Sequence, residues 1–183
     1  MSKVCVFFAP GYEEIEALTV VDLLRRAGIS TEMVSVSEAK MVAGSHGINV
    51  EMDLCLSEVD FASADMLVLP GGMPGTKNLE ACPELMTWVD KFYNEGKYLG
   101  AICAAPSILG HRGILQGKKA CAFPGFESQL TGAEVSLNSV ERDDKVITSR
   151  GMGCAIDFAL EIVTVFKGKA VADELAEKII YSK

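Results

Sequence analysis

The chain has 183 residues, of which 49% are hydrophobic and 23% are charged, a composition typical of one globular domain with a sizeable core. Its net charge of -8 and isoelectric point near 4.8 argue against a surface that binds nucleic acid or an anionic membrane. The apolar segment before Pro10 is too short for a signal peptide or a membrane span. We therefore expect a single domain over residues 1–183, located in the cytoplasm.

The first two predicted elements are a strand and a helix. Residues 3–9 form an unbroken β-branched and aromatic run, which indicates a strand buried on both faces. Residues 13–27 favour a helix that begins with glutamates, ends with arginines and is followed by Gly28 as a C-cap. Glu16 heads its apolar stripe, where burial would raise the pKa of this carboxyl above about 4.3. The alternative is a solvent-exposed glutamate that only favours the helix dipole.

Two turns in the next part of the chain carry candidate binding groups. Residues 30–36 favour a strand, and residues 40–55 favour two short strands around a turn that holds His46. A histidine in such a turn either stays in solvent or contacts an anion or substrate. The apolar strand 66–69 leads into a glycine-rich turn at 70–75, whose backbone N–H groups can approach a ligand and serve as oxyanion donors. Neither phosphate-binding glycine fingerprint is present.

A cysteine corner follows the predicted helix at 83–95. The strand that begins at Tyr98 runs to Cys103, small residues flank the cysteine at Ala101 and Ala105, and Pro106 opens the next helix. This strand, corner and helix resemble a nucleophile elbow, which needs small neighbours for steric reasons. The helix N-terminus would lower the pKa of the Cys103 thiol from about 8.5 and make it reactive. A buried structural thiol is the alternative.

The remaining elements complete an alternating pattern. We expect a strand at 119–122, a short helix at 126–130, a hairpin formed by 134–137 and 139–142, a strand at 145–149, and helices at 154–166 and 170–180. This alternation predicts an α/β fold with a mostly parallel sheet covered by helices on both faces. Ligands bind at the carboxyl ends of such strands, so the turns near Glu16 and Cys103 should meet at one edge.

The cysteines do not suggest a metal centre. Six of them are scattered singly at positions 5, 55, 82, 103, 121 and 154, with no C-x-x-C pair and only two histidines in the chain. We therefore expect no metal site, and reduced thiols that mostly pack in the core.

Four motifs in order along the chain resemble the ThiJ/PfpI superfamily, and their spacing is similar to that of its DJ-one branch. They are the segments 13–29, 68–72, 101–106 and 148–151. The resemblance implies a flavodoxin-like three-layer sandwich, a homodimer and no cofactor. It also implies that Cys103 is an oxidation-sensitive nucleophile, that Glu16 is the protonated partner of its sulfur, and that the amides of Gly72 and Ala104 form an oxyanion pocket.

The chain departs from the family pattern at three positions. Peptidase-like members carry a histidine directly after the cysteine, where this chain has Ala104, so a peptidase dyad lacks its base. Phe123 stands where the branch has a pocket histidine. His46 replaces an arginine of an anion-binding pocket, whereas Arg26 matches its neighbour there.

Two functions remain open on this basis. The first is a cofactor-independent glyoxalase or deglycase, a hydro-lyase or hydrolase acting on reactive dicarbonyls such as methylglyoxal or on their early adducts with proteins. In this reaction Cys103 would form a hemithioacetal and Glu16 would transfer a proton. The second is a non-catalytic redox sensor or holdase chaperone that acts through oxidation of Cys103.

Overall fold

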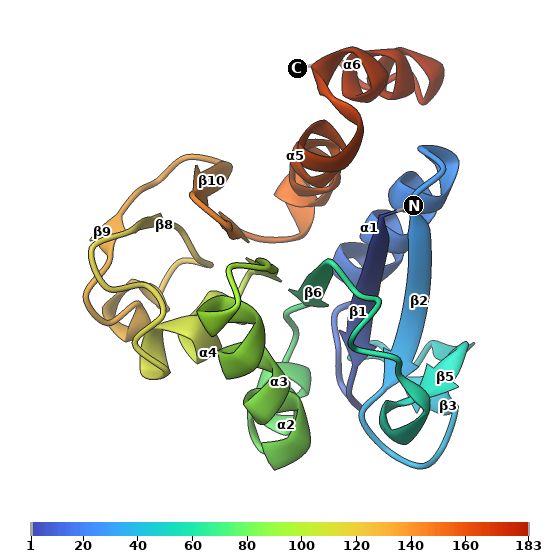
Figure 1. Ribbon diagram of the computed structural model, residues 1–183, viewed down its shortest axis with the longest axis vertical. Helices are drawn as coiled ribbons and strands as arrows, with labels where there is room; N and C mark the ends of the chain where they lie inside the picture. Colours follow the sequence, from blue (N-terminus) through green and yellow to red (C-terminus); the bar gives the residue numbers. More distant parts are fainter. Residues whose placement is uncertain (1, 183) are drawn as a thin grey trace.

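A seven-stranded sheet forms the centre of the computed structural model, which describes residues 2–182 (Figure 1). All neighbouring strands in it are parallel except the pair formed by residues 140–143 and 146–149. The spatial order is β10 (Val140–Asp143), β11 (Val146–Ser149), β7 (Tyr98–Ile102), β6 (Met66–Leu69), β1 (Lys3–Phe8), β2 (Ser30–Ser35) and β5 (Leu54–Cys55). Two small sheets pair β3 (Met41–Ala43) with β4 (Asn49–Glu51), and β8 (Lys119–Ala120) with β9 (Glu134–Val135).

Helices cover both faces of the central sheet, which gives the expected three-layer α/β architecture (Figure 1). One face carries α1 (Glu14–Arg26), α5 (Ala155–Lys167) and α6 (Lys169–Lys178). The other face carries α2 (Gly75–Glu80), α3 (Pro83–Asn94) and α4 (Pro106–His111). Three short 3-10 helices, η1 (Leu56–Glu58), η2 (Glu127–Gln129) and η3 (Met152–Cys154), lie in the connections. Among residues 2–182, no helix combines the length and apolar character needed to cross a bilayer.

The unbroken apolar sequence of β1 follows from its central place in the sheet. Cys5 and Phe7 pack into the core on the side of α3, whereas Val6 and Phe8 pack into the core on the side of α1. Successive side chains of a strand point to opposite faces, so a strand covered on both faces is apolar throughout.

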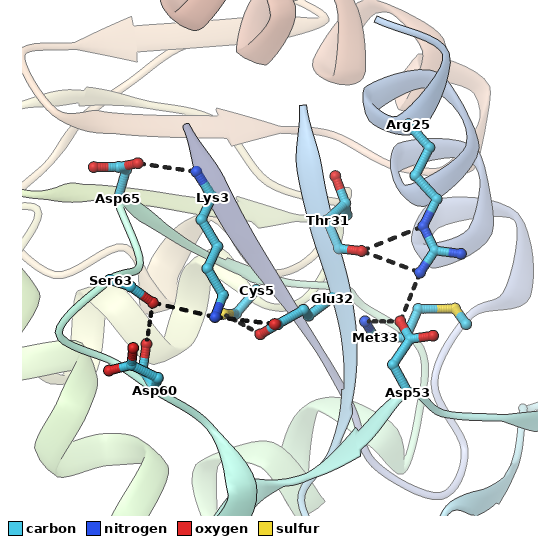
Figure 2. Close-up of polar contacts among 10 residues, drawn as sticks. All are labelled: Lys3, Cys5, Arg25, Thr31, Glu32, Met33, Asp53, Asp60, Ser63 and Asp65. Carbon is cyan, nitrogen blue, oxygen red and sulfur yellow. Dashed lines mark hydrogen bonds and ion pairs between the residues drawn. The ribbon is translucent and has the colours of Figure 1, made fainter. Parts of the chain in front are cut away.

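The C-terminal end of α1 is tied to the edge of the sheet by polar contacts (Figure 2). Arg25 donates to the backbone oxygen of Thr31 on β2 at 3.0 Å and pairs with Asp53 at 2.6 Å. Gly28 then reverses the chain with a φ of +68°, a conformation that glycine adopts without the steric cost of a Cβ. The helix therefore ends close to where its sequence predicts.

One local expectation was wrong, and one helix was missed. Residues 134–142 do not form a hairpin, because β9 pairs in parallel with β8 while β10 pairs antiparallel with β11. The hairpin instead closes at Asp144 and Lys145, and Asp144 adopts a φ of +54°, which aspartate tolerates better than most residues. The glycine-rich turn at 70–75 also continues directly into α2, which the sequence analysis did not predict.

Candidate active site

The turns that follow β1, β6, β7 and β11 meet at the carboxyl edge of the central sheet, as the alternating pattern predicts. Glu13 donates its backbone N–H to Gly71 O at 2.9 Å, which ties the first turn to the second. Cys103 donates its backbone N–H to Ser149 O at 2.9 Å, which ties the third turn to the fourth. The edge therefore brings together four segments that are far apart in the sequence.

Cys103 occupies a sharp corner between β7 and α4. Its φ is +66°, in the left-handed region that non-glycine residues rarely adopt. The corner is held on both sides, because Cys103 also accepts a hydrogen bond from Phe123 N–H at its backbone oxygen, at 2.8 Å. The flanking Ala101 and Ala105 are fully buried, so larger side chains would not fit there. This geometry is that of a nucleophile elbow, and it leaves the cysteine side chain half-buried.

The carboxyl group of Glu16 lies against the cysteine. Glu16 is 1% exposed, which excludes the alternative of a glutamate in solvent. It interacts with the Cys103 side chain, and its Oε2 accepts the backbone N–H of Gly71 at 3.0 Å. A Cβ at Gly71 would lie 2.6 Å from both the Cys103 Cβ and the Glu16 Oε2, so only glycine leaves room for this contact.

Burial raises both pKa values of this pair. Desolvation raises the pKa of Glu16 to about 7, although its hydrogen bonds to Cys103 and Gly71 oppose the shift. Desolvation first, and then the Glu16 charge, raise the pKa of Cys103 to about 12. This net shift is opposite to the one expected from the helix N-terminus. Because each anion disfavours the other, the pair loses one proton near pH 7 and retains its second proton well above that.

Two backbone amides face the sulfur, at the positions named from the sequence. The N–H groups of Gly72 and Ala104 donate hydrogen bonds to Cys103 and so favour its anion. Gly72 has a φ of +91°, and a Cβ there would lie 2.3 Å from the Glu13 backbone nitrogen. The glycine therefore lets the loop approach both the helix start and the sulfur.

Of the three other candidates, only Phe123 lies at this site. A Cβ at Gly151 would be 3.2 Å from the Phe123 ring and 3.9 Å from Glu16 Oε1, so these residues form the rim beside the carboxyl group. Phe123 is 44% exposed. Arg26 lies ten residues beyond Glu16 on α1, about 15 Å along the helix axis, and pairs with Asp22. His46 contacts the carboxylates of Glu13 and Glu14.

The sequence analysis missed Gly71 and Gly151 as site residues. Each stands two positions after the last residue of a strand, which was a usable signal, but only the folded chain places them against Glu16.

A carboxylate beside a thiol does not by itself define the site. Cys5 also lies 3.7 Å from a carboxylate oxygen, that of Glu32, which Lys3 contacts (Figure 2). Cys5 is fully buried in the middle of β1, and burial raises its pKa to about 12. Cys103 differs because it is half-buried, follows the end of its strand and faces two amides.

The fold and this edge define the class of protein: a flavodoxin-like α/β protein with a cysteine at a nucleophile elbow. The DJ-1/PfpI family model matches residues 2–165, and the chain belongs to that family, in its DJ-1 branch. The solved structure of oxidized DJ-1 from Toxoplasma gondii is 35% identical, covers 100% of both chains and superimposes with a TM-score of 0.96.

Curated relatives extend the comparison. Protein DJ-1 homolog B of Arabidopsis thaliana is 36% identical over 97% of this chain. This chain spans 41% of that protein's length and 46% of the length of homolog A. The glutathione-independent glyoxalase DJR-1.2 of Caenorhabditis elegans is 31% identical, over 93% of this chain and 91% of its own length.

Proposed function

We propose that this DJ-1-type stress protein is a cofactor-independent glyoxalase that converts methylglyoxal, or its early adducts with proteins, through Cys103 and Glu16. The observation that carries the proposal is the interaction of a half-buried thiol with a buried carboxyl group, with two amides facing the sulfur. The relative named a glutathione-independent glyoxalase supports the same reaction class.

The first step is addition of the Cys103 thiolate to the aldehyde carbon. A carbon–sulfur bond forms, the carbonyl electron pair moves to oxygen, and that oxygen takes a proton to give a hemithioacetal. The amides of Gly72 and Ala104 face the sulfur and so lie within reach of an oxygen on the carbon bonded to it. The reactive form of the pair is the thiolate with a protonated Glu16.

The second step is a proton transfer within the bound substrate. Glu16 has by then given its proton to the oxygen. It next removes the proton of the former aldehyde carbon, which gives an enediol, and then returns a proton to the neighbouring carbon. The aldehyde carbon is thereby oxidised to a thioester and the ketone carbon reduced to an alcohol, so no external oxidant is needed. Water then cleaves the thioester and releases lactate and the free thiol. A carboxyl group with a pKa of about 7 suits both directions of transfer.

A redox function is the second candidate, and one observation favours it. The hydrogen bond from a protonated Glu16 would stabilise a Cys103 sulfinate, and the Toxoplasma gondii relative was solved in an oxidized form. In this case the protein acts as a redox sensor or holdase chaperone.

Lactate production from methylglyoxal by wild type, Cys103→Ala, Glu16→Gln and Cys5→Ala tests the proposal. We expect activity in wild type and Cys5→Ala, and its loss in the other two. An inactive wild type whose Cys103 is selectively oxidised to the sulfinate by peroxide would replace the glyoxalase with the redox sensor.

A further inference from the structure

We propose that the first turn of α1 and the turn between β3 and β4 together form a binding site for one Zn²⁺ ion, with Glu13, Glu14, His46 and Ser45 as ligands. The proposal is separate from the glyoxalase reaction, because these side chains do not include Cys103 or Glu16. The sequence analysis expected no metal site, because the cysteines are scattered singly and the chain has only two histidines; the four residues proposed here come from two segments about 30 residues apart.

Four donor atoms converge at this place. His46 Nδ1 lies 3.1 Å from Glu14 Oε2 and 3.8 Å from Glu13 Oε2. Ser45 Oγ lies 3.0 Å from His46 Nδ1, 3.1 Å from Glu14 Oε2 and 3.2 Å from Glu13 Oε2. The three ligand atoms of the two glutamates and the histidine are all within 4.8 Å of one another.

These separations match the edges of a zinc coordination tetrahedron. Zinc binds nitrogen and oxygen ligands at about 2.0–2.2 Å, which places tetrahedral ligands about 3.3–3.6 Å apart. The five separations above run from 3.0 to 3.8 Å. Small side-chain movements therefore suffice to place all four atoms around one ion. Two carboxylates, an imidazole and a hydroxyl also form a donor set that suits a borderline divalent cation.

The four side chains carry more negative than positive charge. Glu13 and Glu14 are 8% and 5% exposed, and within residues 2–182 no lysine or arginine forms an ion pair with either. His46 is their only cationic partner there, so two buried carboxylates face at most one positive charge. A divalent ion would balance the charge of the second buried carboxylate.

Backbone contacts hold the two segments together before any ion binds. Ser45 donates its N–H to Tyr12 O at 2.8 Å, and the His46 N–H donates to Glu14 Oε1 at 2.8 Å. A Cβ at Gly44 would lie 2.3 Å from the Glu14 carboxyl carbon, so the turn packs directly on that side chain. The Glu14 carboxylate is therefore fixed in position, which lowers the entropic cost of binding.

The site is open on one side. The His46 side chain is 67% exposed, and a cavity of about 240 Å³ is lined by Glu13, Glu14, His46, Ile15, Ile48 and Met152. An ion can enter through this cavity, and a water molecule there can replace Ser45 as the fourth ligand.

Titration of untagged, ¹⁵N-labelled protein with zinc chloride tests the proposal without an activity assay. Calorimetry gives the stoichiometry, and the imidazole nitrogen signals report the ligand directly because the chain contains only two histidines. We expect one Zn²⁺ per chain at micromolar concentrations and a shift of the His46 signals alone. His46→Ala and Glu13→Gln should each weaken binding by more than about 10-fold, the lower end of what even outer-shell substitutions cost.

His111→Ala is the matched control, because His111 pairs with a single carboxylate, Glu80, at 2.7 Å. It should bind zinc as wild type does. Glu13→Gln keeps the proposal testable if His46→Ala fails to fold. Circular dichroism checks that both variants are folded. Zinc binding that survives both substitutions would place the ion on the thiols and overturn the proposal. Binding only at millimolar zinc, or unchanged His46 signals, would also overturn it.

Discussion

Replacing Gly71 by alanine places a methyl group between the nucleophile and its carboxyl partner. The new Cβ would lie 2.6 Å from Glu16 Oε2, 2.6 Å from Cys103 Cβ and 3.0 Å from Ile102 O. Ordinary contacts with a Cβ begin near 3.4 Å, so the two side chains must separate by roughly 1 Å. Cys103 is anchored by two backbone hydrogen bonds, and we therefore expect Glu16 to move.

The displacement should affect catalysis more than stability. A misplacement of about 1 Å can reduce a catalysed rate by about 100-fold, because the proton transfer requires hydrogen-bond reach. Crowding in a well-packed region costs about 1–3 kcal/mol, which corresponds to a fall of about 2–4 °C in Tm per kcal/mol for a chain of this size. Folded Gly71→Ala protein should thus survive at 25 °C while losing almost all of its lactate production.

Steady-state kinetics with methylglyoxal and thermal unfolding test this expectation together. Gly153→Ala is the matched control, because a Cβ at Gly153, in the neighbouring turn, meets no atom within 4 Å. It should retain wild-type activity and stability. If folded Gly71→Ala kept a rate within about threefold of wild type, the contact between Glu16 and Cys103 would not be needed for the reaction, and the reasoning would fail.

Three further predictions follow from burial and pKa. The pair of Cys103 and Glu16 must lose one proton to reach its reactive form, and the pKa of Glu16 is raised to about 7, so kcat/KM should rise as the pH increases through about 7. A profile that is flat from pH 5.5 to 8.5 would contradict this role. Iodoacetamide at pH 8 should modify Cys103 well before Cys5 or Cys121, because those two thiols are fully buried whereas Cys103 is half-buried. Peptide mass spectrometry reads the order, and equal rates would refute it. Phe158→Ala should lower the free energy of unfolding by about 3–5 kcal/mol, because this fully buried ring packs between α5 and the sheet. Urea denaturation measures the loss. A change below about 1 kcal/mol would show that the core fills the cavity left by the ring.

The elements that the sequence predicted well are those with strong local signals. The apolar runs of β1 and β6 require cover on both faces, and the charge order of α1 follows its own dipole. The corner at Cys103 was also predictable, since small residues on either side are a steric requirement of the turn itself. Each of these signals depends on residues within a few positions of one another.

Burial, pairing and charge were decided by the tertiary structure. Helical periodicity left Glu16 undecided between solvent and core, and its 1% exposure arises because loops after β6 and β11 close over it. The partner of β9 is β8 rather than β10, because strand pairing depends on distant segments. The raised pKa of Cys103 likewise comes from desolvation and from a carboxyl group 87 positions earlier in the chain.

The sequence by itself thus determined most of the elements and the corner at Cys103, and the family resemblance named Glu16 as its partner. Only the tertiary structure brought the Glu16 carboxyl group to Cys103, and Glu13, Glu14 and His46 to one place on the surface. The physical reason is that backbone conformation responds to neighbours in the chain, whereas desolvation and electrostatic coupling depend on distances in space, which exist only after long-range packing has formed.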